Sequence, residues 1–160
     1  MAELRNVMTY LVRNYPHKHE LSKARLTKMI YLADWKSAIE HQRQMTGIEW
    51  QFNHFGPYVD DVHNLALEDS AFSVKSEQNM FGKPKETIVL ADRLADDRVS
   101  NEEAAILDHV IEQTKRLTWD AFIKLVYSTY PVLTGSRGSR LDLVKSAEAY
   151  REVEAQLAEL

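Results

Sequence analysis

Four side chains that can bind a metal ion fall within ten positions of one another: His54, Asp60, Asp61 and His63. Imidazole nitrogens and carboxylate oxygens are ligands of zinc and non-haem iron, and metal-bound water can act as a hydrolytic nucleophile. However, the spacing is not that of an H-E-x-x-H helix, and the adjacent Asp60 and Asp61 cannot share one helix face. A metal-dependent hydrolase is therefore an alternative, but we expect no bound metal.

The chain has no motif for nucleophilic catalysis or phosphate binding. It contains no cysteine and no G-x-S-x-G sequence, so it offers neither a thiolate nucleophile nor a hydrolase-type serine turn. Residues 135–140 read Gly-Ser-Arg-Gly-Ser-Arg, but they lack the G-x-x-x-x-G-K-[ST] pattern and follow a predicted helix rather than a strand. We therefore expect no catalytic residue and no cofactor, and we interpret residues 134–140 as a mobile basic loop.

Aromatic side chains gather in one part of the chain. They are Tyr31, Trp35, Trp50, Phe52, Phe55 and Tyr58. Such a cluster is more often core than binding site, but tyrosine and tryptophan also anchor protein interfaces. Where part of the cluster stays exposed beside Asp34, Asp60 and Asp61, it would form an aromatic patch with an acidic rim.

Charge is distributed unevenly along the chain. The 160 residues carry a net charge of −4, with +4 in residues 1–36, −9 in residues 37–114 and +4 in residues 115–145. An acidic middle repels phosphate and attracts a basic partner, so a nucleic-acid partner is not expected. A DNA-binding autoregulator is kept as an alternative that would use basic residues toward both ends. These are Arg5, Arg13, Lys23, Arg25, Lys28, Arg137 and Arg140.

Hydrophobic periodicity predicts an α+β fold that is mainly α-helical, in a single domain over residues 1–160. The chain is 44% hydrophobic, and no apolar run approaches the ~20 residues that cross a bilayer, so we expect a cytoplasmic protein without membrane contact. We expect helices over residues 2–14, 22–42, 119–128 and 143–159, one that opens at Pro57 and one that follows Ser100. Strands expected at 48–52, 71–76 and 86–91 would form one small antiparallel sheet.

Local signals fix several of these boundaries. Ser22 and Thr118 are expected N-caps, and Ser100 with Glu103 fits a capping box. Gly56 is expected to turn the chain sharply, and Pro57 to occupy the first position of the next helix. The helix over 119–128 is apolar nearly all round, which predicts a central position, and Tyr130-Pro131 is expected to end it.

Three segments together resemble a known family. They are Leu26-Thr-Lys-Met-Ile-Tyr-Leu-Ala-Asp-Trp35, Trp50-Gln-Phe52 and Phe55-Gly-Pro-Tyr58. This combination resembles the SocA-like antitoxin family, also called the Panacea domain, whose members show a helix of the type L-x-K-L-L-Y-F-A-D-W, then an aromatic strand and a Y-G-P turn. The resemblance covers about residues 3–150; Phe55 stands where tyrosine is usual, and residues 72–100 match weakly.

The resemblance implies a non-enzymatic protein that neutralises a toxin encoded beside it. Members act by direct binding, at least one as an adaptor that delivers its toxin to an AAA+ protease, and the domain occurs in phages and prophages. We therefore expect a cognate toxin as the partner, with the protease as a further one. The expected partner-binding residues are Tyr31, Asp34, Trp35, Trp50, Phe55 and Tyr58, and Gly56 and Pro57 are expected to be structural.

Overall fold

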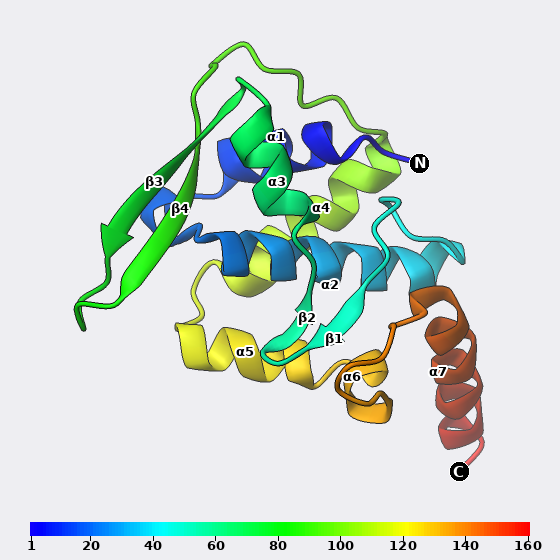
Figure 1. Cartoon of the computed structure of the whole chain (residues 1–160). Helices are drawn as coiled ribbons and strands as arrows, with labels where there is room; N and C mark the ends of the chain where they lie inside the picture. The colour runs from blue at the N-terminus through cyan, green and yellow to red at the C-terminus, as the bar shows by residue number, and fades with distance from the viewer.

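The longest helix runs through the middle of the molecule (Figure 1). The computed structural model covers residues 1–160, and this helix, α2, spans Lys23–His41. Its buried positions run from Arg25 to Ala38 with only Lys36 more exposed, so both the apolar face and the mixed face expected from the sequence are covered. Four helices and two strands contact α2: α1 (Leu4–Asn14), α3 (Asp61–Glu68), α4 (Asn101–Thr114), α7 (Leu143–Ala158), β2 (Gly56–Tyr58) and β4 (Pro84–Leu90). The fold is therefore built around one central helix.

The chain is mainly helical, as its periodicity predicts. The helices are α1 (Leu4–Asn14), α2 (Lys23–His41), α3 (Asp61–Glu68), α4 (Asn101–Thr114), α5 (Trp119–Tyr127), α6 (Tyr130–Thr134), α7 (Leu143–Ala158) and a 3₁₀ turn η1 (Lys18–Glu20). Ser22 and Thr118 cap α2 and α5 through their side chains, and Ser100 with Glu103 completes a capping box on α4. These expected helix starts are confirmed.

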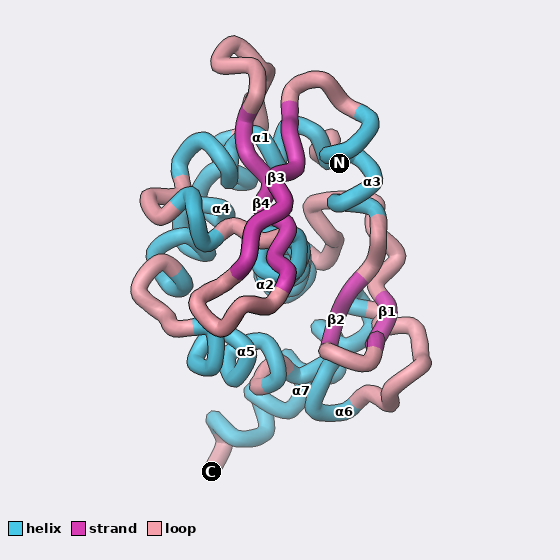
Figure 2. The backbone as a smooth tube through the Cα atoms, turned by 60° about the vertical axis from the view of Figure 1, so that its left-hand side comes forward, coloured by secondary structure: helices cyan, strands magenta, loops and turns pink.

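The strands form two separate antiparallel hairpins rather than the single sheet that we expected (Figure 2). One joins β1 (Gln51–Asn53) to β2 (Gly56–Tyr58), and the other joins β3 (Phe72–Gln78) to β4 (Pro84–Leu90).

One edge of each hairpin pairs with a segment outside the hairpin. The edge of β1 that faces away from β2 pairs with residues 139–141, where Phe52 N–H donates to the Ser139 carbonyl and Leu141 N–H donates to the Trp50 carbonyl. The Ile88 N–H of β4 donates to the Leu21 carbonyl just before α2. Each hairpin therefore has one edge paired with a segment outside it, and the two hairpins remain separate sheets.

Two local expectations are corrected by the structure, and a third is confirmed in part. Pro57 does not open a helix: it lies in β2 opposite Phe52, and α3 begins at Asp61, because Gly56 turns the chain back along β1. Helix α5 is not central, since only Phe122 and Val126 are buried in it. Helix α5 ends before Tyr130-Pro131 as expected, but these residues begin a further helix, α6, and Pro131 lies in its first turn, where its missing N–H needs no partner.

A single cluster of 34 buried hydrophobic residues connects these elements. It includes residues from α1, α2, α4, α5 and α7, and from both hairpins. None of the helices combines the length and the hydropathy that crossing a membrane would require. The β1–β2 hairpin lies over this core between α2 and α5 (Figure 1), and Gly56 sits against the Tyr127 ring.

Replacing Gly56 tests this hairpin. Gly56 has φ of +98°, and an added Cβ would lie 3.2 Å from the Tyr127 ring. Gly138 has φ of +85° with nothing near an added Cβ, so it is a matched control. We expect Gly138→Ala to lower the free energy of unfolding by about 1 kcal/mol from backbone strain and Gly56→Ala by about 2–3 kcal/mol. Equal losses in urea melts would show that the contact with Tyr127 does not matter.

Candidate partner-binding cleft

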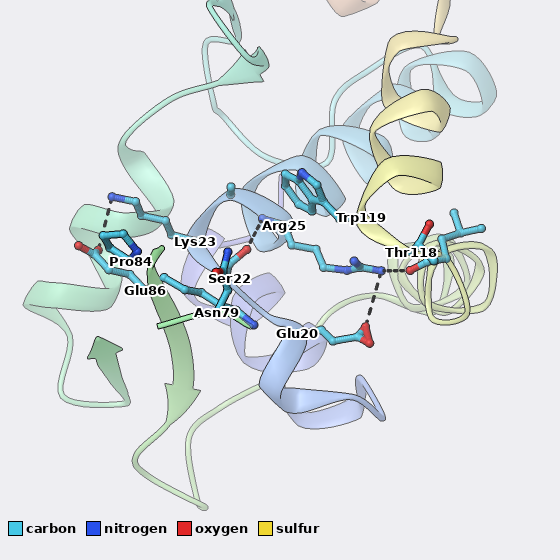
Figure 3. Close-up of a pocket in the computed structure, with 12 residues that line it drawn as sticks. Glu20, Ser22, Lys23, Arg25, Asn79, Pro84, Glu86, Thr118 and Trp119 are labelled. Atoms are coloured by element: carbon cyan, nitrogen blue, oxygen red, sulfur yellow. Dashed lines mark hydrogen bonds and ion pairs between the residues drawn. The ribbon is translucent and has the colours of Figure 1, made fainter. Parts of the chain in front are cut away.

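Two adjoining hollows lie where α2 begins. The first hollow, of about 490 Å³, is bordered by α2, the β3–β4 hairpin and the start of α5 (Figure 3). The second hollow, of about 610 Å³, is bordered by α2, the β1–β2 hairpin and α5. Lys23, Ala24 and Trp119 line both, so the two hollows form one continuous surface, which we name the α2 cleft.

Arg25 binds the wall of the first hollow to α2. Its buried guanidinium donates through Nη2 to the carbonyls of Thr114 and Leu117, each at 3.0 Å. The same group lies 4.7 Å from the centre of the Phe122 ring of α5. Since unpaired carbonyls collect at a helix C-terminus, a cation is favourable there. Arg25 therefore holds the end of α4 and the start of α5 against α2.

Glu86 binds the opposite wall of the first hollow. Its Oε2 lies 2.7 Å from Nε2 of His63 on α3 and 3.4 Å from Nζ of Lys23 on α2. Strand β4, helix α2 and helix α3 thus meet at one carboxylate. The charged side chains around the first hollow pair with groups of the same chain. This half of the cleft therefore holds α2, α3, β4 and the segment between α4 and α5 together.

Aromatic side chains line the second hollow. Phe55, at the turn of the β1–β2 hairpin, is 73% exposed, and Trp119, at the start of α5, is 44% exposed. Tyr58 and Tyr127 are half-buried in the same wall. Exposed aromatic side chains from two different elements that meet over one hollow are typical of a protein-binding surface.

Lys28 is the only lysine of α2 that is buried. It is 2% exposed, and its Nζ lies 5.4 Å from the centre of the Tyr58 ring. Burial alone lowers the pKa of Lys28 to about 8, because no acidic side chain or carbonyl compensates its charge. Lys28 also lines the second hollow, so an unpaired cation lies beneath the aromatic surface.

Three expected partner-binding residues are buried behind this surface. Asp34 accepts hydrogen bonds from the Thr46 N–H at 2.8 Å, the Thr46 hydroxyl at 2.7 Å and the Trp50 indole N–H at 2.9 Å. The Tyr31 hydroxyl lies 2.8 Å from that of Thr129, and its ring packs edge-on against Trp50 at 5.5 Å. Tyr31, Asp34 and Trp50 have no exposed surface in this structure. They support the β1–β2 hairpin from inside and do not form the exposed patch that we expected.

Trp35 also lies apart from the cleft. It is buried, and its ring packs against Tyr150 of α7 at 5.6 Å. Of the six expected partner-binding residues, only Phe55 and Tyr58 line the α2 cleft. Helical spacing could not identify Tyr31, Asp34 and Trp35 as buried, because α2 is covered on all its sides and no face of it is exposed.

The sequence reasoning missed two residues of the cleft. Trp119 was expected only as the start of a central helix, and its exposure follows from the peripheral position of α5. Lys28 was grouped with the basic residues of a DNA surface, whereas it is buried under Tyr58. A lysine between apolar helix positions is a signal of burial, but it does not say what faces the charge.

The two alternative functions find little support in this geometry. No group of three or more histidine or acidic side chains is placed to hold a metal ion, and Nε2 of His63 lies 2.7 Å from Oε2 of Glu86. Among the basic residues of the DNA alternative, Arg5, Arg13 and Lys23 pair with acidic side chains, and Arg25 and Lys28 are buried. The remaining two, Arg137 and Arg140, are exposed beside β1.

Comparison with protein-family models matches residues 26–131 to the antitoxin SocA-like family, Panacea domain. The chain belongs to this family. The matched range contains Lys28, Phe55, Tyr58, Trp119 and Tyr127, so most of the second hollow is built from the Panacea domain itself. The resemblance inferred from the sequence is confirmed over this range, which is shorter than residues 3–150. Comparisons with curated proteins and with solved structures gave no match.

The Asp34 network is expected to be a major source of stability. Asp34→Ala would leave the Thr46 N–H and the Trp50 indole N–H buried without an acceptor, so we expect the free energy of unfolding to fall by about 3–5 kcal/mol. The control is Asp61→Ala at the exposed first turn of α3, which should cost less than about 1 kcal/mol. Similar losses for both variants in urea melts would contradict this role.

The pH dependence of stability should report on the same carboxylate. Burial raises the pKa of Asp34 to about 6 from 3.8, because its desolvation outweighs the hydrogen bonds to the ionised form. The folded chain then takes up this proton at a higher pH than the unfolded chain, so the contribution of Asp34 to stability falls as the pH rises from about 4 to about 6.

Asp34→Asn removes this titration and tests its direction. We expect the free energy of unfolding of the wild type, minus that of Asp34→Asn, to decrease over this pH interval in urea melts. A difference that stays constant or rises would mean that the folded-state pKa of Asp34 is not raised.

Proposed function

We propose that this Panacea-domain chain neutralises a cognate toxin by direct binding, and that the toxin contacts the second hollow of the α2 cleft. Membership of an antitoxin family supports the class of partner. The observation that carries the location is that Phe55 and Trp119 stay exposed over one hollow. Covering them with a partner would remove a large aromatic surface from water.

The surface is held in shape before a partner arrives. Residues 139–141 pair with one edge of the β1–β2 hairpin, Gly56 rests on Tyr127, and the Asp34 network fixes the chain that leads into β1. A rigid surface loses little conformational entropy on association, which favours tight binding. The buried residues Tyr31, Asp34 and Trp50 therefore act on binding through the position of the hairpin rather than through contact.

Acidic side chains beside the second hollow can pair with basic groups on the surface of the toxin around the contact. Asp60 lies at the rim of the second hollow and Asp61 follows at the start of α3, within the acidic middle of the chain. Opposite charges at the rim accelerate encounter and make it sensitive to salt, while buried aromatic contacts set the rate of dissociation. We therefore expect association with the toxin to slow as the ionic strength rises.

Blocking and proteolytic delivery are distinguishable in cells. The toxin encoded beside this chain's gene is co-expressed with the chain, and both growth and the half-life of the toxin are measured. Growth rescue with an unchanged toxin half-life supports neutralisation by binding alone. A toxin half-life that shortens only in the presence of the chain supports delivery to an AAA+ protease. Failure to rescue growth would contradict the antitoxin function itself.

Phe55→Ala tests the proposed surface. We expect it to weaken toxin binding at least tenfold, about 1.4 kcal/mol or more, by faster dissociation. Its melting temperature should stay unchanged, since the side chain is 73% exposed. Phe81→Ala is the matched control, because Phe81 is 79% exposed at the end of the other hairpin. Equal affinities of the two variants in surface plasmon resonance would place the interface elsewhere.

A further inference from the structure

Lys28 differs from the other charged groups that α2 buries. Arg25 donates to two carbonyls at the end of α4, and Asp34 accepts three hydrogen bonds. Lys28 makes no salt bridge and no hydrogen bond, and its Nζ lies 5.4 Å from the centre of the Tyr58 ring. Of the three buried charged side chains of α2, Lys28 is thus the one whose charged group has no hydrogen bond or ion pair, and it lines the second hollow.

An unpaired buried ammonium destabilises a fold. Removing it from water is unfavourable, and contact with one aromatic face compensates only part of that loss. An apolar side chain of the same length would fill this position without the desolvation cost. A charge held in this way is therefore better explained by a ligand than by the stability of the free chain.

The surroundings of Lys28 select the kind of anion. No arginine lines the second hollow, its other lysine, Lys23, pairs with Glu86, and the acidic Asp60 also lines it. Burial raises the pKa of Tyr58, and the nearby charges of Asp60 and Glu86 raise it further. One ammonium is left to balance an incoming anion, so a singly charged carboxylate suits the hollow better than a doubly charged phosphate. The aromatic walls suit the carbon chain of an amino-acid side chain.

We propose that Lys28 binds a carboxylate side chain of the toxin, which enters the second hollow between Phe55 and Trp119. The proposal rests on the proposed function and adds to it the chemistry of the contact. The toxin's acidic residue pairs with the ammonium, and its neighbours cover the aromatic rim. The contact selects a toxin that presents an acidic side chain on an otherwise complementary surface.

The test compares Lys28→Met with the wild-type chain, using the purified toxin encoded beside this chain's gene as the probe. Methionine is an unbranched apolar side chain only one atom shorter than lysine and removes the charge, so we expect the melting temperature to stay the same or rise. We expect toxin binding to weaken at least tenfold in calorimetry. The control is Lys36→Met on the same helix, whose Nζ pairs with Glu40 and lies outside the cleft. It should bind the toxin as the wild type does.

A double-mutant cycle identifies the partner group. Each acidic residue of the toxin is replaced by its amide; one replacement should weaken binding to the wild type tenfold but have no further effect with Lys28→Met. If Lys28→Met binds as tightly as the wild type, or if no toxin carboxylate couples to Lys28, the Lys28 proposal fails while the antitoxin function stands. Inorganic phosphate that displaces the toxin better than acetate at equal ionic strength also overturns it. A toxin that does not bind the wild-type chain contradicts the proposed function instead.

Discussion

The structure depends on the burial of a helix that carries polar and charged residues. Helix α2 is covered on all sides, so its polar groups must find partners within the protein. Arg25 finds them at the C-terminal carbonyls of α4, and Asp34 finds them at Thr46 and Trp50. Each pairing brings a different segment of the chain to α2. The walls of the α2 cleft are therefore consequences of satisfying buried charges.

This arrangement links stability to recognition. The segment that Asp34 holds leads into β1, and the β1–β2 hairpin carries Phe55 and Tyr58 to the cleft. Arg25 holds the segment between α4 and α5, and the first residue of α5 is Trp119. Two buried charges thus place the two aromatic walls of the proposed toxin surface. Substitutions at either charge would disturb binding without a contact to the partner.

Local sequence signals predicted most of the helices but not how the edges of the two hairpins pair with other segments. The caps at Ser22, Ser100 and Thr118 act within one turn of helix, so sequence spacing alone identifies them. The other edge of β1 pairs with residues 139–141, which lie so far along the sequence that no local signal indicates the pairing. The burial of Trp50 and the exposure of Phe55 also depend on contacts between segments far apart in the sequence. Aromatic type and spacing are alike in both, and only the tertiary packing separates core from surface.

The most direct test of this account is the pKa of Lys28 in the free chain, measured from the ¹³Cε shift of selectively labelled lysine with Lys28→Met for assignment. Burial without a compensating charge predicts a pKa of about 8 for this group, well below the ordinary lysine value of 10.5. A value near 10.5 would mean that the ammonium is solvated or already paired. Such a value would contradict the central claim that α2 buries one charged side chain without a partner in the free chain.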